Sequence, residues 1–101
     1  MGKYQMGDGT IINTEKAAQT WDEDTYFDGH NNCSVATGSQ WNHERLHKSR
    51  RGRYYVLHWS QWQGSRDHCE WVSEHEAARW LLANEHELPA DLAHLAEDIE
   101  E

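Results

Sequence analysis

The segment RYYVLHWSQW, residues 53–62, limits what this chain can fold into more than any other stretch. Tyrosine, valine and tryptophan are favoured on a pleated sheet surface, so the segment predicts a strand. The turn-like segment KSRRG precedes it, and QWNHERLH (residues 40–47) precedes that turn. We therefore expect residues 40–62 to form an antiparallel hairpin with a basic tip.

Strand alternation places apolar bulk on both faces of residues 53–62. Tyr55 and Trp59 point to one face and Tyr54 points to the other. One face must pack against a helix, whereas the second is covered by a further layer, covered by a partner chain, or exposed. A chain of 101 residues has little material for a further layer, and exposed aromatic patches mark interaction sites. The sequence therefore predicts an aromatic binding face, and its expected anchors are Tyr54, Trp62 and Trp41.

The chain changes character at about Val72. Before this point, four further runs predict strands, because they are rich in aromatic or β-branched residues or lie between turn signals. These runs are GTII (9–12), TWDEDTYF (20–27), NCSVATGSQW (32–41) and HCEWV (68–72). After it, the apolar spacing becomes helical. We expect an α+β fold, in which an antiparallel β-meander of four to five strands packs against a C-terminal helix, with a short second helix. Residues 1–101 are expected to form one domain, strand-rich over 1–72 and helical over 73–101.

The first helix is marked at both ends. Ser73 and Glu76 have the spacing of a capping box, and Asn84 is a suitable C-terminal stop. A second amphipathic helix is predicted by spacings of four, three and four residues between Leu88, Leu92, Leu95 and Ile99.

Composition narrows the functional classes. The chain has 18 acidic and 9 basic residues, a formal charge of −9, which disfavours general attachment to nucleic acid or to an anionic membrane. No apolar run is long enough for a transmembrane helix, and the N-terminus lacks the apolar region of a signal peptide. We expect a cytoplasmic protein.

In that compartment Cys33 and Cys69 are expected to be free thiols, with a disulfide between them as the alternative.

The string HERLH (residues 43–47) matches the H-E-x-x-H motif, which binds zinc when it lies on a helix. Here it falls in a predicted strand, where residues four apart are separated by roughly 13 Å. Two ligands of one zinc ion, each about 2.0–2.1 Å from the metal, do not span that distance. We interpret His43 and His47 as a polar pair on a sheet face, so that alanine at either position changes stability by no more than about 0.5 kcal/mol. The other histidines show no ligand spacing, although a site assembled by the fold remains open.

Charge is segregated along the chain. Five of the nine basic residues lie at the expected hairpin tip, and they are Arg45, Lys48, Arg50, Arg51 and Arg53. Residues 85–101 contain seven acids and no lysine or arginine. These runs are either solvated surfaces or two opposed docking faces.

The favoured hypothesis is a non-catalytic acidic protein that binds another macromolecule, for example as an inhibitor or adaptor docking on a host or defence complex. Its partner would be a different protein or a second copy of the chain. The alternative is a small nucleic-acid-binding domain that uses the basic tip, residues 45–53. A zinc-dependent hydrolase acting through residues 43–47 is a minor alternative. No catalytic residue, cofactor, bound metal or membrane attachment is expected.

A resemblance covers about residues 38–92. The run GRYYVLHWSQWQGS, followed by EWVSEHEAARWLL, is similar to small uncharacterised bacterial proteins of the kind encoded near mobile elements. The resemblance implies neither an activity nor a functional residue.

Overall fold

A four-stranded antiparallel sheet forms the centre of the molecule. The computed structural model describes residues 3–39, 41–61 and 66–99, and its central strands lie in the order β3 (Gln19–Asp22), β6 (Asn42–Lys48), β7 (Tyr54–Ser60) and β8 (His68–Val72). Strands β6, β7 and β8 form a meander, and the predicted antiparallel hairpin is confirmed over residues 42–60. With helix α1 (Glu74–Ala83) packed on one face, the fold is α+β as expected.

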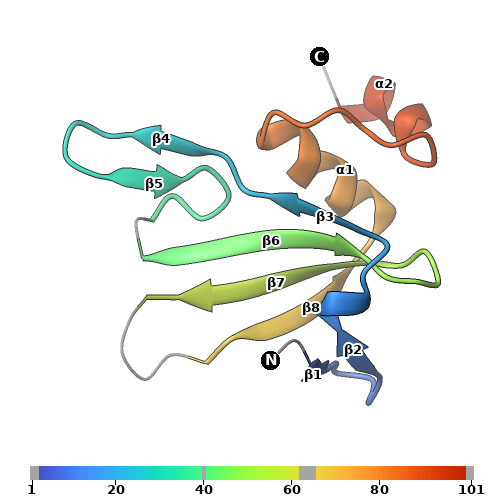
Figure 1. The fold of residues 1–101 in the computed structure, drawn as a ribbon. Coiled ribbons are helices and arrows are strands. Elements are labelled where there is room, and N and C mark those ends of the chain that lie inside the picture. The colour runs from blue at the N-terminus through green and yellow to red at the C-terminus, as the bar shows by residue number, and fades with distance from the viewer. Residues whose placement is uncertain (1–2, 40, 62–65, 100–101) are drawn as a thin grey trace.

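Two smaller hairpins accompany this sheet (Figure 1). One pairs β1 (Lys3–Gln5) with β2 (Ile11–Asn13) and continues into a 3-10 turn at Thr14–Lys16. The other pairs β4 (Thr25–Phe27) with β5 (Asn32–Ser34) and extends away from one side of the central sheet. Because β4 and β5 leave the sheet, β3 lies directly beside β6, and only part of the predicted meander is consecutive in sequence.

The strand predicted over residues 20–27 is interrupted at Glu23 and Asp24. The carboxylate of Glu23 turns inward and accepts a hydrogen bond from the backbone N–H of Glu44 at 3.2 Å. The backbone N–H of Asp24 donates to Oδ1 of Asn84 at 2.9 Å, which ties this bend to the end of α1. These bonds join residues far apart in sequence, so local strand propensity did not indicate the bend.

Helix α1 begins and ends as predicted. Ser73 Oγ accepts from the backbone N–H of Glu76 at 3.1 Å, and Glu76 Oε1 accepts from the backbone N–H of Ser73 at 3.3 Å. Asn84 is the C-cap, and its side chain donates to the carbonyl oxygen of Trp80 at 2.8 Å. The helix buries its small apolar side against the sheet, forming an upper core of Leu46, Tyr54, Val56, Ala77, Ala78, Leu81, Leu92 and Leu95.

The C-terminal segment contributes its predicted apolar residues but less helix than their spacing indicated. Leu92 is fully buried, and Leu88 and Ile99 pack against the same core. Regular structure begins only with a 3-10 turn at Ala93–Leu95 and continues as α2 (Ala96–Ile99). Among the described residues, no helix has the length and apolar character that crossing a membrane requires.

The second face of the sheet is covered, which corrects the expectation of an exposed aromatic face. Met6 and Ile12, from the β1–β2 hairpin, are buried against this face. The lower core that they complete also contains Tyr55, Leu57 and Cys69, with Tyr4, Trp59 and Trp71 at its margin. The N-terminal residues therefore supply the further layer that was not expected in a chain of this length. Both cysteines are free, as predicted, and both are buried.

Candidate functional site

The turn between β6 and β7 is held by its own hydrogen bonds. The backbone N–H of Ser49 donates to the carbonyl oxygen of Arg53 at 2.7 Å, and the N–H of Gly52 donates to that of Ser49 at 2.9 Å. Ser49 Oγ also accepts from the N–H of Arg53 at 3.1 Å. Gly52 has φ +87°, a left-handed conformation in which a side chain is strained. This geometry fixes the backbone positions from which the arginine side chains of the turn project.

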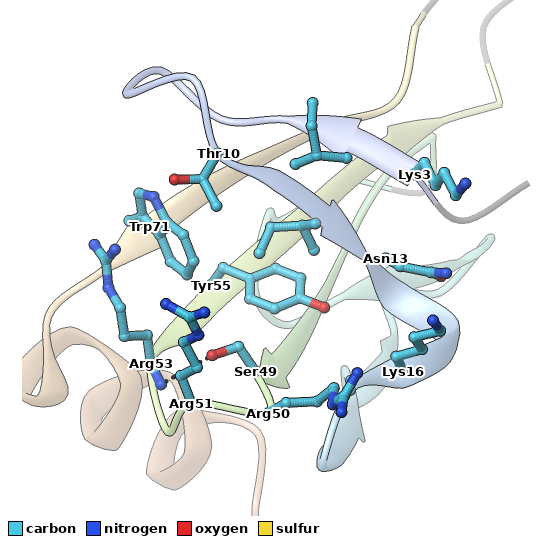
Figure 2. A pocket seen from close by; sticks show the side chains of 13 residues that line it. Lys3, Thr10, Asn13, Lys16, Ser49, Arg50, Arg51, Arg53, Tyr55 and Trp71 are labelled. Carbon is cyan, nitrogen blue, oxygen red and sulfur yellow. Dashed lines mark hydrogen bonds between the residues drawn. The ribbon is translucent and has the colours of Figure 1, made fainter.

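A pocket of about 540 Å³ lies between this turn and the β1–β2 hairpin (Figure 2). Its apolar wall comprises Ile11, Ile12, Tyr55 and Trp71. Its cationic residues come from two distant parts of the chain and are Lys3, Lys16, Arg50, Arg51 and Arg53. We call this feature the cationic pocket.

The charge around the cationic pocket is opposite to that of the whole protein. Five of the nine lysines and arginines line it, although the net charge is −9. Arg53 lies 3.7 Å from the ring centre of Trp71, and its Nη1 is 3.8 Å from Oδ2 of Asp8. Within the described part of the chain, no carboxylate forms an ion pair with the other four cations. Their charge is therefore available to an anionic ligand.

Tyr55 lies at the base of the cationic pocket. Its side chain is fully buried, and its hydroxyl has no hydrogen-bond partner among the residues that the structure describes. Burial raises the pKa of this hydroxyl to about 12, so it stays protonated at neutral pH. The ring stacks on His47 at 5.0 Å between ring centres and meets Trp71 edge-on at 5.8 Å. The base of the pocket is therefore formed by packed aromatic rings.

The structure divides the five predicted basic residues into two groups. Arg50, Arg51 and Arg53 line the cationic pocket. Arg45 and Lys48 do not line it, because they lie on the strand rather than in the turn. Nε of Arg45 is 2.6 Å from Oδ1 of Asp22, and Nζ of Lys48 is 3.2 Å from Oδ2 of Asp91. We therefore remove Arg45 and Lys48 from the candidate site.

Tyr54 and Trp41, the two predicted aromatic anchors that the structure describes, are not brought together. Tyr54 is only 1% exposed and donates its hydroxyl hydrogen bond to Asp91 Oδ2 at 2.9 Å, so its proposed role as a surface anchor is wrong. Trp41 is 40% exposed, but it precedes β6 and lies at the end of that strand remote from the turn. Trp62 lies outside the described residues.

The HERLH string lies on β6, as predicted, and does not form a zincin site. Its glutamate, Glu44, pairs across the sheet with His58, whereas His43 and His47 pair with Trp59 and Tyr55 on the opposite face. A single ion therefore does not reach all three side chains.

The interpretation of these histidines as a replaceable polar pair is also wrong. His47 is only 3% exposed, and its Nδ1 is 2.9 Å from Thr20 Oγ1. His43 stacks on Trp59, and its Nδ1 is in hydrogen-bond contact with the carboxylate of Glu23. Both rings are packed parts of the fold, so alanine at either position would remove buried contacts.

Sequence reasoning missed Lys3 and Lys16. They are isolated cations more than 30 positions before Arg50, and no local pattern links them to the turn. The useful signal was the apolar second face of residues 53–62, which needed a covering layer. Comparison of the chain with family models, with curated proteins and with solved structures gave no match.

Proposed function

We propose that the protein is a non-catalytic binding protein whose cationic pocket holds a nucleotide of a single-stranded nucleic acid. The observation that supports this most is the convergence of five cations from two segments on one pocket, in a chain with a net charge of −9. The protein as a whole is acidic and therefore repels polyanions. A local concentration of positive charge in such a protein indicates a specific anionic ligand rather than general attraction to polyanions.

The pocket offers both kinds of contact that a nucleotide needs. Arginine guanidinium groups bind phosphate oxygens through paired hydrogen bonds, and Arg50 and Arg51 are exposed and free of carboxylate partners in the described part of the chain. Apolar side chains accept the face of a base, as the 61% exposed Ile11 can, and Trp71 lies in the same pocket with Arg53 stacked over its ring. A volume of about 540 Å³ is in the range of small-ligand pockets and suits one nucleotide, not a duplex.

The test is a fluorescence anisotropy titration with a labelled single-stranded DNA of ten nucleotides. Binding is expected to weaken with salt, with a slope of log K against log[salt] of about −2, because few phosphates are contacted. The double variant Arg50→Glu/Arg51→Glu should lose at least about tenfold in affinity, since each reversal removes an attraction and adds a repulsion.

The matched control is Arg66→Glu/Arg79→Glu, which changes the net charge equally at exposed positions outside the pocket. It should retain most of the binding. Competition by free adenosine monophosphate would indicate that the pocket binds a free nucleotide. A lack of competition would indicate that it requires a strand. Equal losses in both double variants would mean that only net charge matters, and the proposal would then fail.

A second candidate function, docking on a basic protein surface, is supported by the β4–β5 hairpin. Tyr26 and Phe27 are 46% and 67% exposed there, and residues 17–44 contain no lysine or arginine. This hairpin extends from the sheet in Figure 1. An exposed aromatic pair in acidic surroundings fits a cationic partner.

Histone protein serves as a basic probe for this second function. Tyr26→Ser/Phe27→Ser should weaken its binding severalfold, whereas Arg50→Glu/Arg51→Glu should not. Histone binding that is indifferent to Tyr26 and Phe27 would reduce the interaction to net charge and remove this candidate.

A further inference from the structure

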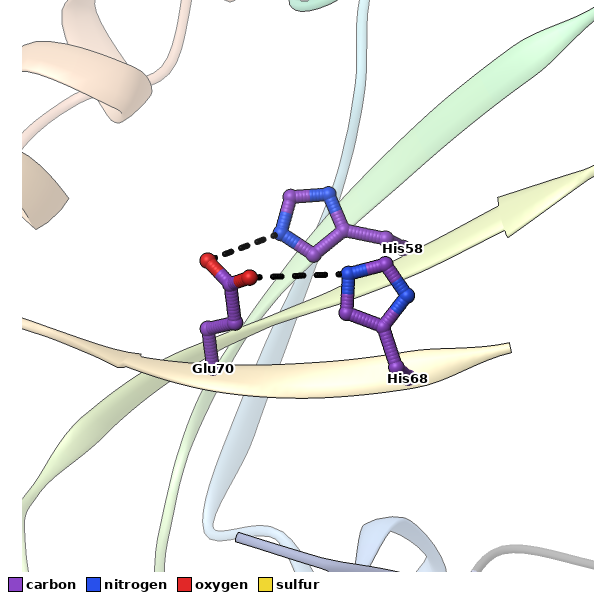
Figure 3. A group of neighbouring side chains, drawn as sticks. All are labelled: His58, His68 and Glu70. Carbon is purple, nitrogen blue, oxygen red and sulfur yellow. Dashed lines mark ion pairs between the residues drawn. The ribbon is translucent and has the colours of Figure 1, made fainter. Parts of the chain in front are cut away.

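Three metal-ligating side chains meet at the end of the central sheet opposite the basic turn. His58 on β7 lies directly across from His68 on β8, and Glu70 follows two residues later on the same strand. Alternation places all three on the face that carries α1. Figure 3 shows the Glu70 carboxylate directed at both imidazole rings. One ligand atom from each side chain lies within 4.8 Å of the others.

The distances suit a shared ion. Glu70 Oε2 is 3.8 Å from Nε2 of His58, and Glu70 Oε1 is 3.6 Å from Nε2 of His68. Ligands about 2.0–2.2 Å from a tetrahedral zinc ion are separated by about 3.3–3.6 Å. The imidazole rings of His58 and His68 stack at 4.6 Å between ring centres and 15° between ring planes, so one ring must turn before both Nε2 atoms face the same ion. The side chains of His68 and Glu70 are 58% and 64% exposed, which leaves both room to adjust and access from solvent.

A second observation points to the same use of His58. Nδ1 of His58 is 3.0 Å from Oε2 of Glu44, and Glu44 Oε1 accepts a hydrogen bond from Trp80 Nε1 at 3.0 Å. The contact with Glu44 at Nδ1 fixes the orientation of the ring, with Nε2 on the side of Glu70. Carboxylate–histidine pairs of this kind support metal-binding histidines in many proteins.

We propose that His58, His68 and Glu70 bind a divalent transition-metal ion, with zinc as the best match, and that Glu44 orients His58. Two imidazoles and one carboxylate form a ligand set that zinc accepts, and a fourth position stays open to water or to a ligand from a partner. The site does not depend on the cationic pocket. It uses the glutamate of the HERLH string as an orienting group and neither of the histidines of that string.

The experiment is isothermal titration of the metal-free protein with zinc chloride, supported by the absorption spectrum of the cobalt(II) form. One equivalent of zinc should bind, with cobalt absorption typical of tetrahedral coordination. His58→Gln and His68→Gln should each weaken zinc binding by at least about thirtyfold, and Glu44→Gln should weaken it by about 10–100-fold. Circular dichroism of each variant verifies that the fold is retained.

His75→Gln/His94→Gln is the control, since it removes two exposed histidines outside the cluster. Zinc affinity and the zinc-induced rise in melting temperature should persist in this variant and disappear in His58→Gln/His68→Gln. Zinc binding that survives His58→Gln/His68→Gln, or no binding by the unmodified protein at 100-fold molar excess of zinc, would overturn the proposal.

If Glu44→Gln does not fold, Trp80→Phe tests the orienting role of Glu44. This variant removes a hydrogen bond to Glu44 and is expected to weaken zinc binding severalfold.

Discussion

Tyr55→Ala is expected to lower the free energy of unfolding by about 3–5 kcal/mol, the range for deletion of a large buried aromatic ring. The side chain is fully buried between the sheet and the β1–β2 hairpin, where it belongs to the lower core with Met6 and Ile12. It also stacks on His47 and meets Trp71 edge-on. Removing the ring leaves a cavity beneath the N-terminal layer and takes away the base of the cationic pocket. Urea denaturation followed by tryptophan fluorescence measures the loss.

Tyr55→Phe is the matched control because it keeps the ring and removes only the hydroxyl. That hydroxyl has no hydrogen-bond partner in the described part of the chain, so its removal should change stability by less than about 1 kcal/mol. A loss below about 1 kcal/mol for Tyr55→Ala would contradict the lower core described above. A large loss for Tyr55→Phe would show that the hydroxyl has a partner.

Acidification from pH 7 to pH 4 should destabilise the protein by about 3 kcal/mol through His47 alone. Burial lowers the pKa of this histidine from its ordinary value of 6.5 to about 4, with Arg45 as a smaller cause in the same direction. The unfolded chain therefore takes up a proton near pH 6.5, whereas the folded chain resists it until about pH 4. Stability is complete above pH 6.5 and falls as the pH decreases through this window. The energy follows from about 1.4 kcal/mol for each pH unit between the two pKa values.

The difference between the unmodified protein and His47→Gln isolates this contribution from other acid-labile groups. Urea denaturation at pH 7 and at pH 4.5 should show a smaller stability loss for His47→Gln. His94→Gln, an exposed histidine, should behave like the unmodified protein. Equal acid sensitivity in all three proteins would contradict the assignment of a buried, neutral His47.

The parts of the fold set by local chemistry were predictable. The Ser73–Glu76 capping box and the turn at residues 48–52 each depend on neighbouring residues, and both formed as expected. The late start of α2 and the bend at Glu23 depend on packing between distant segments, which periodicity does not contain. Cover for the second sheet face came from Met6 and Ile12, which are too few to give a detectable pattern.

The candidate sites show the same division. Three arginines of the cationic pocket were predicted because they are consecutive or nearly so, but Lys3 and Lys16 join them only through the folded β1–β2 hairpin. Tyr54 was misjudged because alternation separates the two faces of a strand without showing which face each layer covers. His58 and His68 are ten positions apart, and only the register of β7 with β8 makes them neighbours.

The β1–β2 hairpin and the β6–β7 turn are proposed to form one ligand site. The most direct test is a ¹H–¹⁵N correlation spectrum of the labelled protein, recorded during titration with the unlabelled ten-nucleotide single-stranded DNA. Saturable shift changes are expected in residues 3–16 and 49–55 together, and these changes should be absent in Arg50→Glu/Arg51→Glu. Changes confined to the β4–β5 hairpin, or an absence of saturable changes in residues 3–16 and 49–55, would contradict it.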